Sequence, residues 1–153
     1  MSSPSLLGAI RERILGDAAL STALPGKIHT NELPQKPLYP AVVLRWPRTE
    51  YQYQTVSGVG NQGQPVTSTI KKPQVEVWID CISAEQGEQI GLLIEDRLTD
   101  RPLPWTIGTQ IQVFPVNFWL ADEVGRSPSG DKQYSWCLQI EAWFIREADR
   151  PAS

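Results

Sequence analysis

Apolar residues recur at helical spacing in two parts of the chain. Ser3-Pro4 is typical of a helix start, because a capping hydroxyl precedes a proline at the first helical position. The apolar residues that follow lie three or four positions apart, which predicts a first helix: Leu6, Leu7, Ile10, Ile14 and Leu15. Asp17 is placed to cap a second, short helix that runs to Leu24 and ends before Pro25-Gly26.

The second helical region follows Ser83. This residue and Gln86 form a capping-box pattern, in which a hydroxyl and an amide three positions apart bond to the first turn of a helix. The helix that they predict has an apolar stripe of Ile90, Leu93, Ile94 and Leu98.

Several other segments have the pattern of β-strands. Residues 41–46 are almost continuously apolar, and residues 50–56 alternate in character. Residues 109–120 contain Pro115, which predicts a sheet edge or a bulge. Residues 133–147 predict the last strand, after a turn region at 122–131.

The clearest strand is 74–81. Its apolar side chains alternate with polar ones, so the two sets face opposite sides of a sheet. Val75, Val77, Ile79 and Cys81 face one way, and Gln74, Glu76, Trp78 and Asp80 face the other.

The order of these elements predicts an α+β fold. The last two strands follow each other directly, which favours an antiparallel pair. We therefore expect a single, mostly antiparallel sheet with helices packed on one face. The 153 residues fit one domain, which we place at 1–148 with a loose tail at 149–153.

A Gly-rich polar stretch at 57–69 predicts a flexible loop. Loops of this length in small domains are usually functional or disordered, and a tolerated surface insertion is the alternative. The glycines fit G-x-G-x-x-G spacing, but neither a helix nor a P-loop lysine follows, so nucleotide binding is not expected. We instead take four residues of the loop as interface candidates: Gly58, Gly60, Asn61 and Gly63.

Composition and charge narrow the possible functions. Six Trp, four Tyr and three Phe supply enough apolar area for an ordered core. The net charge is −3 and the basic residues are scattered, which argues against tight nucleic-acid binding. The chain has neither a membrane-spanning apolar run nor the basic start of a secretory signal. We therefore expect that the protein is synthesised in the cytoplasm and does not associate with a membrane. In the cytoplasm Cys81 and Cys137 stay reduced.

Residues for catalysis are scarce. His29 is the only histidine and has no nucleophile placed near it by a motif, and two cysteines with one histidine do not complete a zinc site. Glu76 and Asp80 share a strand face but lie about 13 Å apart along it, which is too far for one ion. We predict no catalytic residue, metal or cofactor. A small metal-dependent hydrolase that uses Glu76, Asp80 and Glu141 is the alternative, and tight Mg²⁺ or Mn²⁺ binding would support it.

Two tryptophans have an unusual position. Trp78 and Trp143 lie on the strand faces opposite the regular apolar stripes. A large aromatic there either packs under another segment of its own chain or anchors a contact with another subunit. We take Glu76, Trp78, Asp80 and Trp143 as candidates for such a contact.

These patterns together resemble a known family. The sequence Leu6-Leu7-Gly8-Ala9-Ile10 leads into Gly16-Asp17-Ala18-Ala19-Leu20, and later segments continue the pattern with Tyr39-Pro40-Ala41-Val42-Val43-Leu44, Val75-Glu76-Val77-Trp78-Ile79-Asp80-Cys81 and Ser83-Ala84-Glu85-Gln86. The order resembles the tail-completion, or tail terminator, proteins of tailed bacteriophages. The resemblance covers nearly the whole chain and rests on short segments, not on a catalytic signature.

The resemblance implies a structural, non-enzymatic role in the virion. Such proteins form a ring, commonly a hexamer, on the last ring of the tail tube, stop its growth and meet the head connector, while DNA passes through the bore. The implied partners are further copies of the chain, the major tail tube protein and the head-connector or neck protein, with assembly in the host bacterial cytoplasm. A mildly acidic lumen would let DNA slide without adhering, and the 57–69 loop would be an arm toward a neighbouring subunit or the tube. A neck or head-completion protein, a minor tail protein and an adaptor with no phage role are the alternatives.

Overall fold

The computed structural model describes residues 5–24, 28–30, 38–46, 53–59, 65–104, 110–121, 125–126 and 132–145. Its helices are α1 (Leu6–Leu15), α2 (Ala18–Ala23) and α3 (Ala84–Thr99). Its strands are β1 (His29–Thr30), β2 (Ala41–Arg45), β3 (Tyr53–Val59), β4 (Pro65–Lys71), β5 (Gln74–Cys81), β6 (Leu103–Pro104), β7 (Gln110–Leu120), β8 (Gly125–Arg126) and β9 (Lys132–Ile145). No helix in the described part of the chain is long and apolar enough to cross a membrane.

Side-chain caps fix where the helices begin. Ser5 Oγ accepts from the Gly8 N–H at 3.0 Å, so the predicted start at Ser3 is wrong: the helix begins only after the last hydroxyl before the apolar run. Asp17 caps α2 by accepting from the Leu20 N–H at 3.0 Å, as predicted. Ser83 accepts from the Gln86 N–H at 3.3 Å, which confirms the predicted cap of α3.

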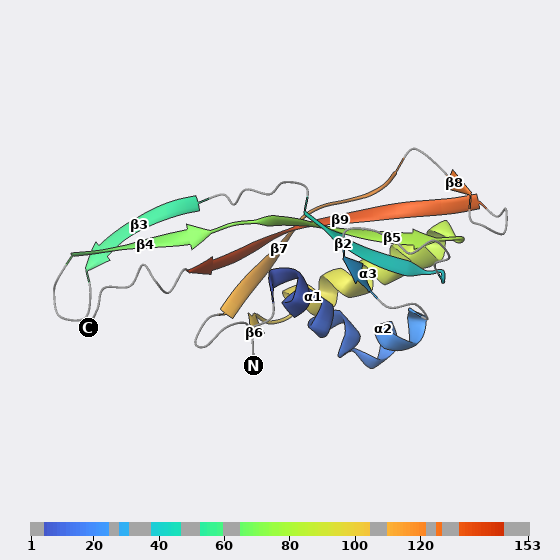
Figure 1. Cartoon of the computed structure of the whole chain (residues 1–153), viewed down its shortest axis with the longest axis horizontal. Helices are drawn as coiled ribbons and strands as arrows, with labels where there is room; N and C mark the ends of the chain where they lie inside the picture. The colour runs from blue at the N-terminus through green and yellow to red at the C-terminus, as the bar shows by residue number, and fades with distance from the viewer. Residues whose placement is uncertain are drawn as a thin grey trace.

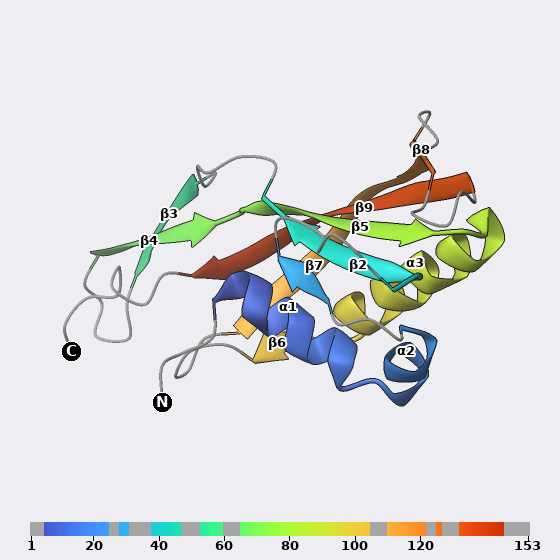
Figure 2. The ribbon, with the colours of Figure 1, turned by 45° about the vertical axis from the view of Figure 1, so that its right-hand side comes forward.

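The sheet is built around β9. On one side β9 pairs with β5 from Gln74↔Glu141 to Cys81↔Tyr134, and on the other side it pairs with β7. Beyond β5 lies β2, and β1 adds to β2 as the parallel pair of an otherwise antiparallel sheet. All three helices lie on one face of this sheet, which confirms the predicted α+β class (Figures 1 and 2).

The core lies between that face and the helices. The fully buried Val77, Ile79 and Leu138 of the sheet belong to one cluster with Ile10 and Ile14 of α1 and Ile94 and Leu98 of α3. On α3 the buried stripe differs from the predicted one, because Gly87 and Gly91 belong to it and Leu93 is only half-buried. A Cβ at Gly87 would lie 2.4 Å from Cys81 Sγ and 2.7 Å from Trp136 Cδ1, so the missing side chain lets the helix lie close to the sheet.

The segment predicted as a loop at 57–69 is largely strand, so that prediction is wrong for its described residues. β3 and β4 form a hairpin from Tyr53↔Lys71 to Val59↔Pro65, in which Gly58 pairs with Val66. Valine and threonine between the glycines favour strands once a partner strand is available, and the glycine content masked that signal. Gly60, Asn61 and Gly63 lie outside the described residues, as does the tail at 149–153.

The hairpin extends the sheet past the core. β4 leads into β5 with no register shift, since Lys71↔Phe144 and Gln74↔Glu141 belong to the same ladder along β9. Only Ile70 and Lys71 of β4 pair with β9, so residues 65–69 reach roughly 17 Å beyond its described end. Figure 1 shows this hairpin at one end of the long axis of the molecule.

Candidate interaction face

The sheet face opposite the helices is the candidate site, and we call it the open face (Figure 2). Strand alternation places on it the polar set of β5 that the sequence predicted. It consists of Gln74, Glu76, Trp78 and Asp80 from β5, Gln112, Phe114, Asn117 and Trp119 from β7, and Ser135, Cys137, Gln139, Glu141 and Trp143 from β9. The sequence candidates Glu76, Trp78, Asp80 and Trp143 are therefore brought to one surface.

One aromatic pair lies across the middle of the open face. Trp78 and Trp119 are the two cross-strand neighbours of Cys137, and their indole centroids are 6.2 Å apart in an edge-on arrangement. Cys137 has no exposed surface, so the two rings cover it. Burial, and secondarily the carboxylate of Glu76, raises the pKa of the Cys137 thiol to about 12. Cys137 is covered because strands from both sides of β9 bring these two rings over it.

A second aromatic pair lies nearer the β3–β4 hairpin. The rings of Trp143 and Phe114 have centroids 5.0 Å apart, and Lys72 Nζ lies 3.9 Å from the centre of the Trp143 ring. The Trp143 indole N–H donates to the Glu141 carboxylate. Phe114 remains 41% exposed, so the open face carries apolar surface that the described part of the chain does not cover.

Neighbouring side chains bind the acids of the open face. Asp80 accepts from Ser135 Oγ at 2.5 Å, and Glu76 accepts from the Trp78 indole N–H at 3.3 Å. Glu141 accepts from Trp143 and from Gln74 Nε2, and Gln74 in turn accepts from Gln139. Within the described ranges, no three His, Cys, Asp or Glu side chains gather as ligands for a metal ion. The hydrolase alternative with Glu76, Asp80 and Glu141 therefore gains no support from the geometry.

At one end of the open face the surface is hollowed. Arg45, Trp78, Asp80, Ala121, Gln133 and Ser135 line a hollow of about 330 Å³. Tyr39 borders it through its hydroxyl, which donates to Gln133 Oε1 at 3.1 Å. Burial, and then the charge of Asp80, raises the pKa of Tyr39, so the phenol stays neutral. A hollow with one aromatic wall and charged or polar rims suits a side chain of a partner protein.

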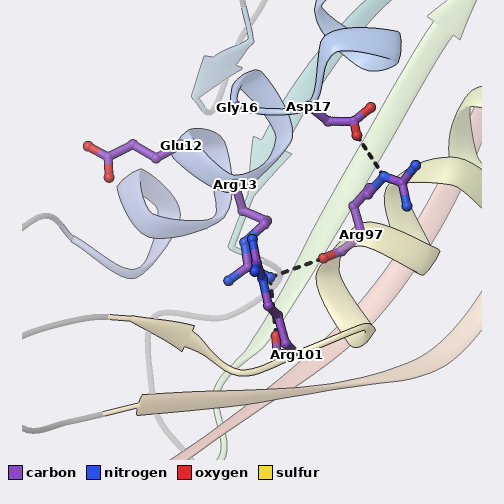
Figure 3. Close-up of a pocket in the computed structure, with 6 residues that line it drawn as sticks. All are labelled: Glu12, Arg13, Gly16, Asp17, Arg97 and Arg101. Atoms are coloured by element: carbon purple, nitrogen blue, oxygen red, sulfur yellow. Dashed lines mark hydrogen bonds and ion pairs between the residues drawn. The ribbon is translucent and has the colours of Figure 1, made fainter.

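A second hollow lies on the helical side, where the cap at Asp17 is the one feature that the sequence predicted. Glu12, Arg13, Gly16, Asp17, Arg97 and Arg101 line about 290 Å³ there (Figure 3). Arg13 donates to the carbonyl oxygens of Arg97, Arg101 and Pro102, which ties α1 to the end of α3.

Three charged side chains of this second hollow, those of Arg13, Asp17 and Arg97, already have partners within the chain. Arg97 Nε donates to Asp17 Oδ1 at 2.7 Å. The Leu20 N–H, and after it Arg97, lowers the pKa of Asp17, while burial and then the charge of Arg101 lower the pKa of Arg13. We therefore assign these residues a structural role in holding the helices together.

The remaining sequence candidates for chemistry stay apart from both hollows. His29 is half-buried in β1. Cys81 is buried on the helical face, with its Sγ 3.5 Å from the Tyr134 carbonyl oxygen, and burial raises the pKa of its thiol. In the described part of the chain, neither side chain is hydrogen-bonded to a second side chain that would complete a nucleophile and base pair.

The chain is similar to a solved structure and to a protein family. A chain of a solved structure described as "Virion of native gene transfer agent (GTA) particle" shares the fold, with a TM-score of 0.50 and 16% sequence identity over 93% of this chain and 96% of that one. A comparison with curated proteins found no match. The family model described as "Tail completion protein gp17" matches residues 8–145. Because this match spans most of the chain, the protein belongs to the tail completion protein gp17 family.

Proposed function

We propose that the protein forms a ring at the end of the phage tail tube, stops tube polymerisation there and provides the surface that joins the tail to the head. The observation that carries this proposal is the family match over residues 8–145. The shared fold of a chain in a virion particle supports a place in the virion tail or neck. The partners are further copies of the chain, in a hexamer by family resemblance, the major tail tube protein and the head connector, with DNA passing through the bore.

The open face supplies contact surface for this role and no reaction chemistry. Tryptophan is enriched where binding energy concentrates, and desolvated aromatics framed by polar groups are typical of interface centres. Trp78 and Trp143 have such a setting, with Glu76 and Asp80 beside Trp78. Trp119 and Phe114, which the sequence did not single out, join them through the aromatic pairs. We propose that these residues contact a neighbouring protein and that the chain acts without catalysis.

We assign to the β3–β4 hairpin the role of the arm that we expected of the 57–69 loop. It extends past the paired end of β9, where it can contact a neighbour without rearrangement of the core. Gln54 and Ile70 are opposite each other, so a two-residue Asn-Gly turn in place of residues 55–69 would shorten the hairpin and keep its base. We expect the shortened protein to fold and to lose attachment to the tail. Normal tail termination by that variant would contradict the arm.

The first experiment is electron microscopy of negatively stained mixtures of the purified protein with polymerising tail tube protein from the same genome. We expect tubes that carry a cap at one end and have a constant length. Tube protein alone, which should give tubes of uncontrolled length, is the control. Uncapped tubes of uncontrolled length in the mixture would contradict the terminator role and favour the neck or head-completion alternative.

A further inference from the structure

β3 and β7 each have an edge that lacks a strand partner along most of its length among the described residues. β3 pairs only with β4, so its outer edge is open from Tyr53 to Val59. β7 pairs with β9 on one side, and on the other side it pairs with β6 only at Gln110 and Ile111. An open edge offers a row of backbone N–H and C=O groups to any strand that can approach.

The two open edges share an unusual lack of charge. β3 lies within residues 51–70 and β7 within residues 102–121, and these are the two longest stretches of the sequence without Asp, Glu, Lys or Arg. Two copies of a chain with a net charge of −3 repel each other. The uncharged edges are therefore where two copies approach each other at the smallest electrostatic cost, which favours a second copy as the partner.

Hydrogen bonds inside the sheet show which backbone groups point out of the β3 edge. The Ala142 N–H donates to the Pro73 carbonyl at 2.9 Å, which fixes the alternation along β9 and, through the unbroken register, along β4. By the same alternation, Thr55, Ser57 and Val59 of β3 direct their N–H and C=O groups away from β4.

The β7 edge is blocked over half its length. The Ala121 N–H donates to the Ser135 carbonyl at 2.8 Å, so Phe118 and Leu120 direct their backbone groups outward. Pro115 also lies on the outward side and has no N–H to donate, and the register shift beside it adds a bulge. Proline and bulges protect edges from unwanted pairing, so the usable part of this edge is 117–120.

The two edges point to a head-to-tail contact. The hairpin lies at one end of the long axis, whereas the C-terminal part of β7 runs toward the other end, where β8 lies (Figure 1). We propose that the open edge of β3 in one copy pairs with residues 117–120 of β7 in the next copy. A contact between two different surfaces of identical chains propagates in one direction, and it closes into a ring when the rotation between neighbours adds up to a full turn. This inference rests on the proposed ring and specifies how its subunits join.

A proline at an outward position of β3 tests the pairing. Ser57→Pro removes one outward N–H and no hydrogen bond within the hairpin, whereas Ser57→Ala changes the same side chain and keeps the N–H. We expect sedimentation velocity, with and without tail tube protein, to show loss of self-association for Ser57→Pro and wild-type behaviour for Ser57→Ala. Circular dichroism and urea unfolding check that both variants fold.

Cross-linking identifies the partner edge. Cys81 and Cys137 are fully buried, so cysteines added by Ser57→Cys or Asn117→Cys are the thiols that a short bis-maleimide reaches. We expect covalent dimers when the two single variants are mixed and none from Ser57→Cys alone. The double variant should give a ladder of products that ends at the ring size.

Other outcomes would overturn the pairing. Cross-links from Ser57→Cys alone would show a two-fold contact, and cross-links to tube protein only would show a different partner. Tubes capped by Ser57→Pro as well as by wild type would overturn the pairing and leave the proposed function intact. A wild-type chain that caps no tubes would contradict the proposed function, and failure of wild type to self-associate under either condition would overturn the pairing.

Discussion

Trp78 and Trp119 meet edge-on above Cys137, with their ring planes at 80° to each other. They come from strands on opposite sides of β9 and are held together by the register of both ladders. The pair closes the open face over a thiol while leaving both indoles half-buried. This combination of a rigid support and accessible aromatic surface is what an interface anchor requires.

Replacing Trp78 should affect assembly more than folding. We expect Trp78→Ala to lower the free energy of unfolding by about 1–2 kcal/mol, because an aromatic pair contributes roughly 0.5–1.5 kcal/mol beyond its buried area. Loss of a binding anchor should cost assembly at least about 2 kcal/mol. Urea unfolding and sedimentation velocity measure the two effects. Leu92→Ala removes an apolar side chain that is 47% exposed on α3 and should change neither; equal assembly by Trp78→Ala and wild type would contradict the anchor role.

The reactivity of the Cys137 thiol tests whether the Trp78–Trp119 pair covers it. Both cysteines are buried and their pKa values are raised, so a maleimide or disulfide reagent should leave the native protein unmodified. In Trp78→Ala we expect Cys137 to become reactive and Cys81, on the other face, to stay protected. Mass spectrometry after brief labelling distinguishes the two sites. Labelling of Cys81 in the variant would mean that the fold had opened more widely.

Gly87 permits the close approach of α3 to the sheet. We expect Gly87→Ala to destabilise the protein by about 1–2 kcal/mol, because overpacking against Cys81 and Trp136 outweighs the gain of roughly 1 kcal/mol in helix propensity. The Trp136 ring cannot move freely, since its N–H donates to the Ala84 carbonyl at 2.8 Å. Gln89→Ala, at an exposed position of the same helix, is the control for urea unfolding. A stabilised Gly87→Ala would show that the sheet yields to the added methyl group.

The Asp17–Arg97 contact predicts a pH-dependent stability. The folded-state pKa of Asp17 is below its ordinary value of 3.8, so its stabilisation is complete above that value and is lost as the pH falls through the folded-state pKa. Asp17→Asn keeps an acceptor for the Leu20 N–H and removes the charge beside Arg97. We expect the wild-type protein to melt at a higher temperature than the variant at neutral pH and the difference to shrink below pH 3.8. Thermal unfolding between neutral pH and about pH 2 measures this. A difference that does not change with pH would show that the charge of Asp17 is not its source.

Local patterns in the sequence were sufficient wherever one element alone decides the structure. The strict alternation of 74–81 predicted both the strand and its two faces, because side chains of any strand alternate with a period of two. The caps at Asp17 and Ser83 were also predictable, since a cap needs only residues within one turn. Pro115 predicted an edge or a bulge, and β7 shows both beside that residue.

Local patterns did not predict the β3–β4 hairpin. Its glycines and polar residues read as a loop because strand formation there depends on pairing with another segment. Pairing with β9 at Ile70 and Lys71 anchors the base of the hairpin, and the paired residues of β4 and β9 are far apart in sequence.

The sequence by itself determined the fold class, the caps of α2 and α3, the two faces of β5 and a family resemblance that the match over residues 8–145 confirms. Only the tertiary structure decided that Trp119 meets Trp78, that Cys137 is covered, that Arg13 ties α1 to α3 and which strand edges stay open. The physical reason is range: caps and alternation act between residues a few positions apart, whereas cross-strand neighbours and edges exist only once distant strands have paired.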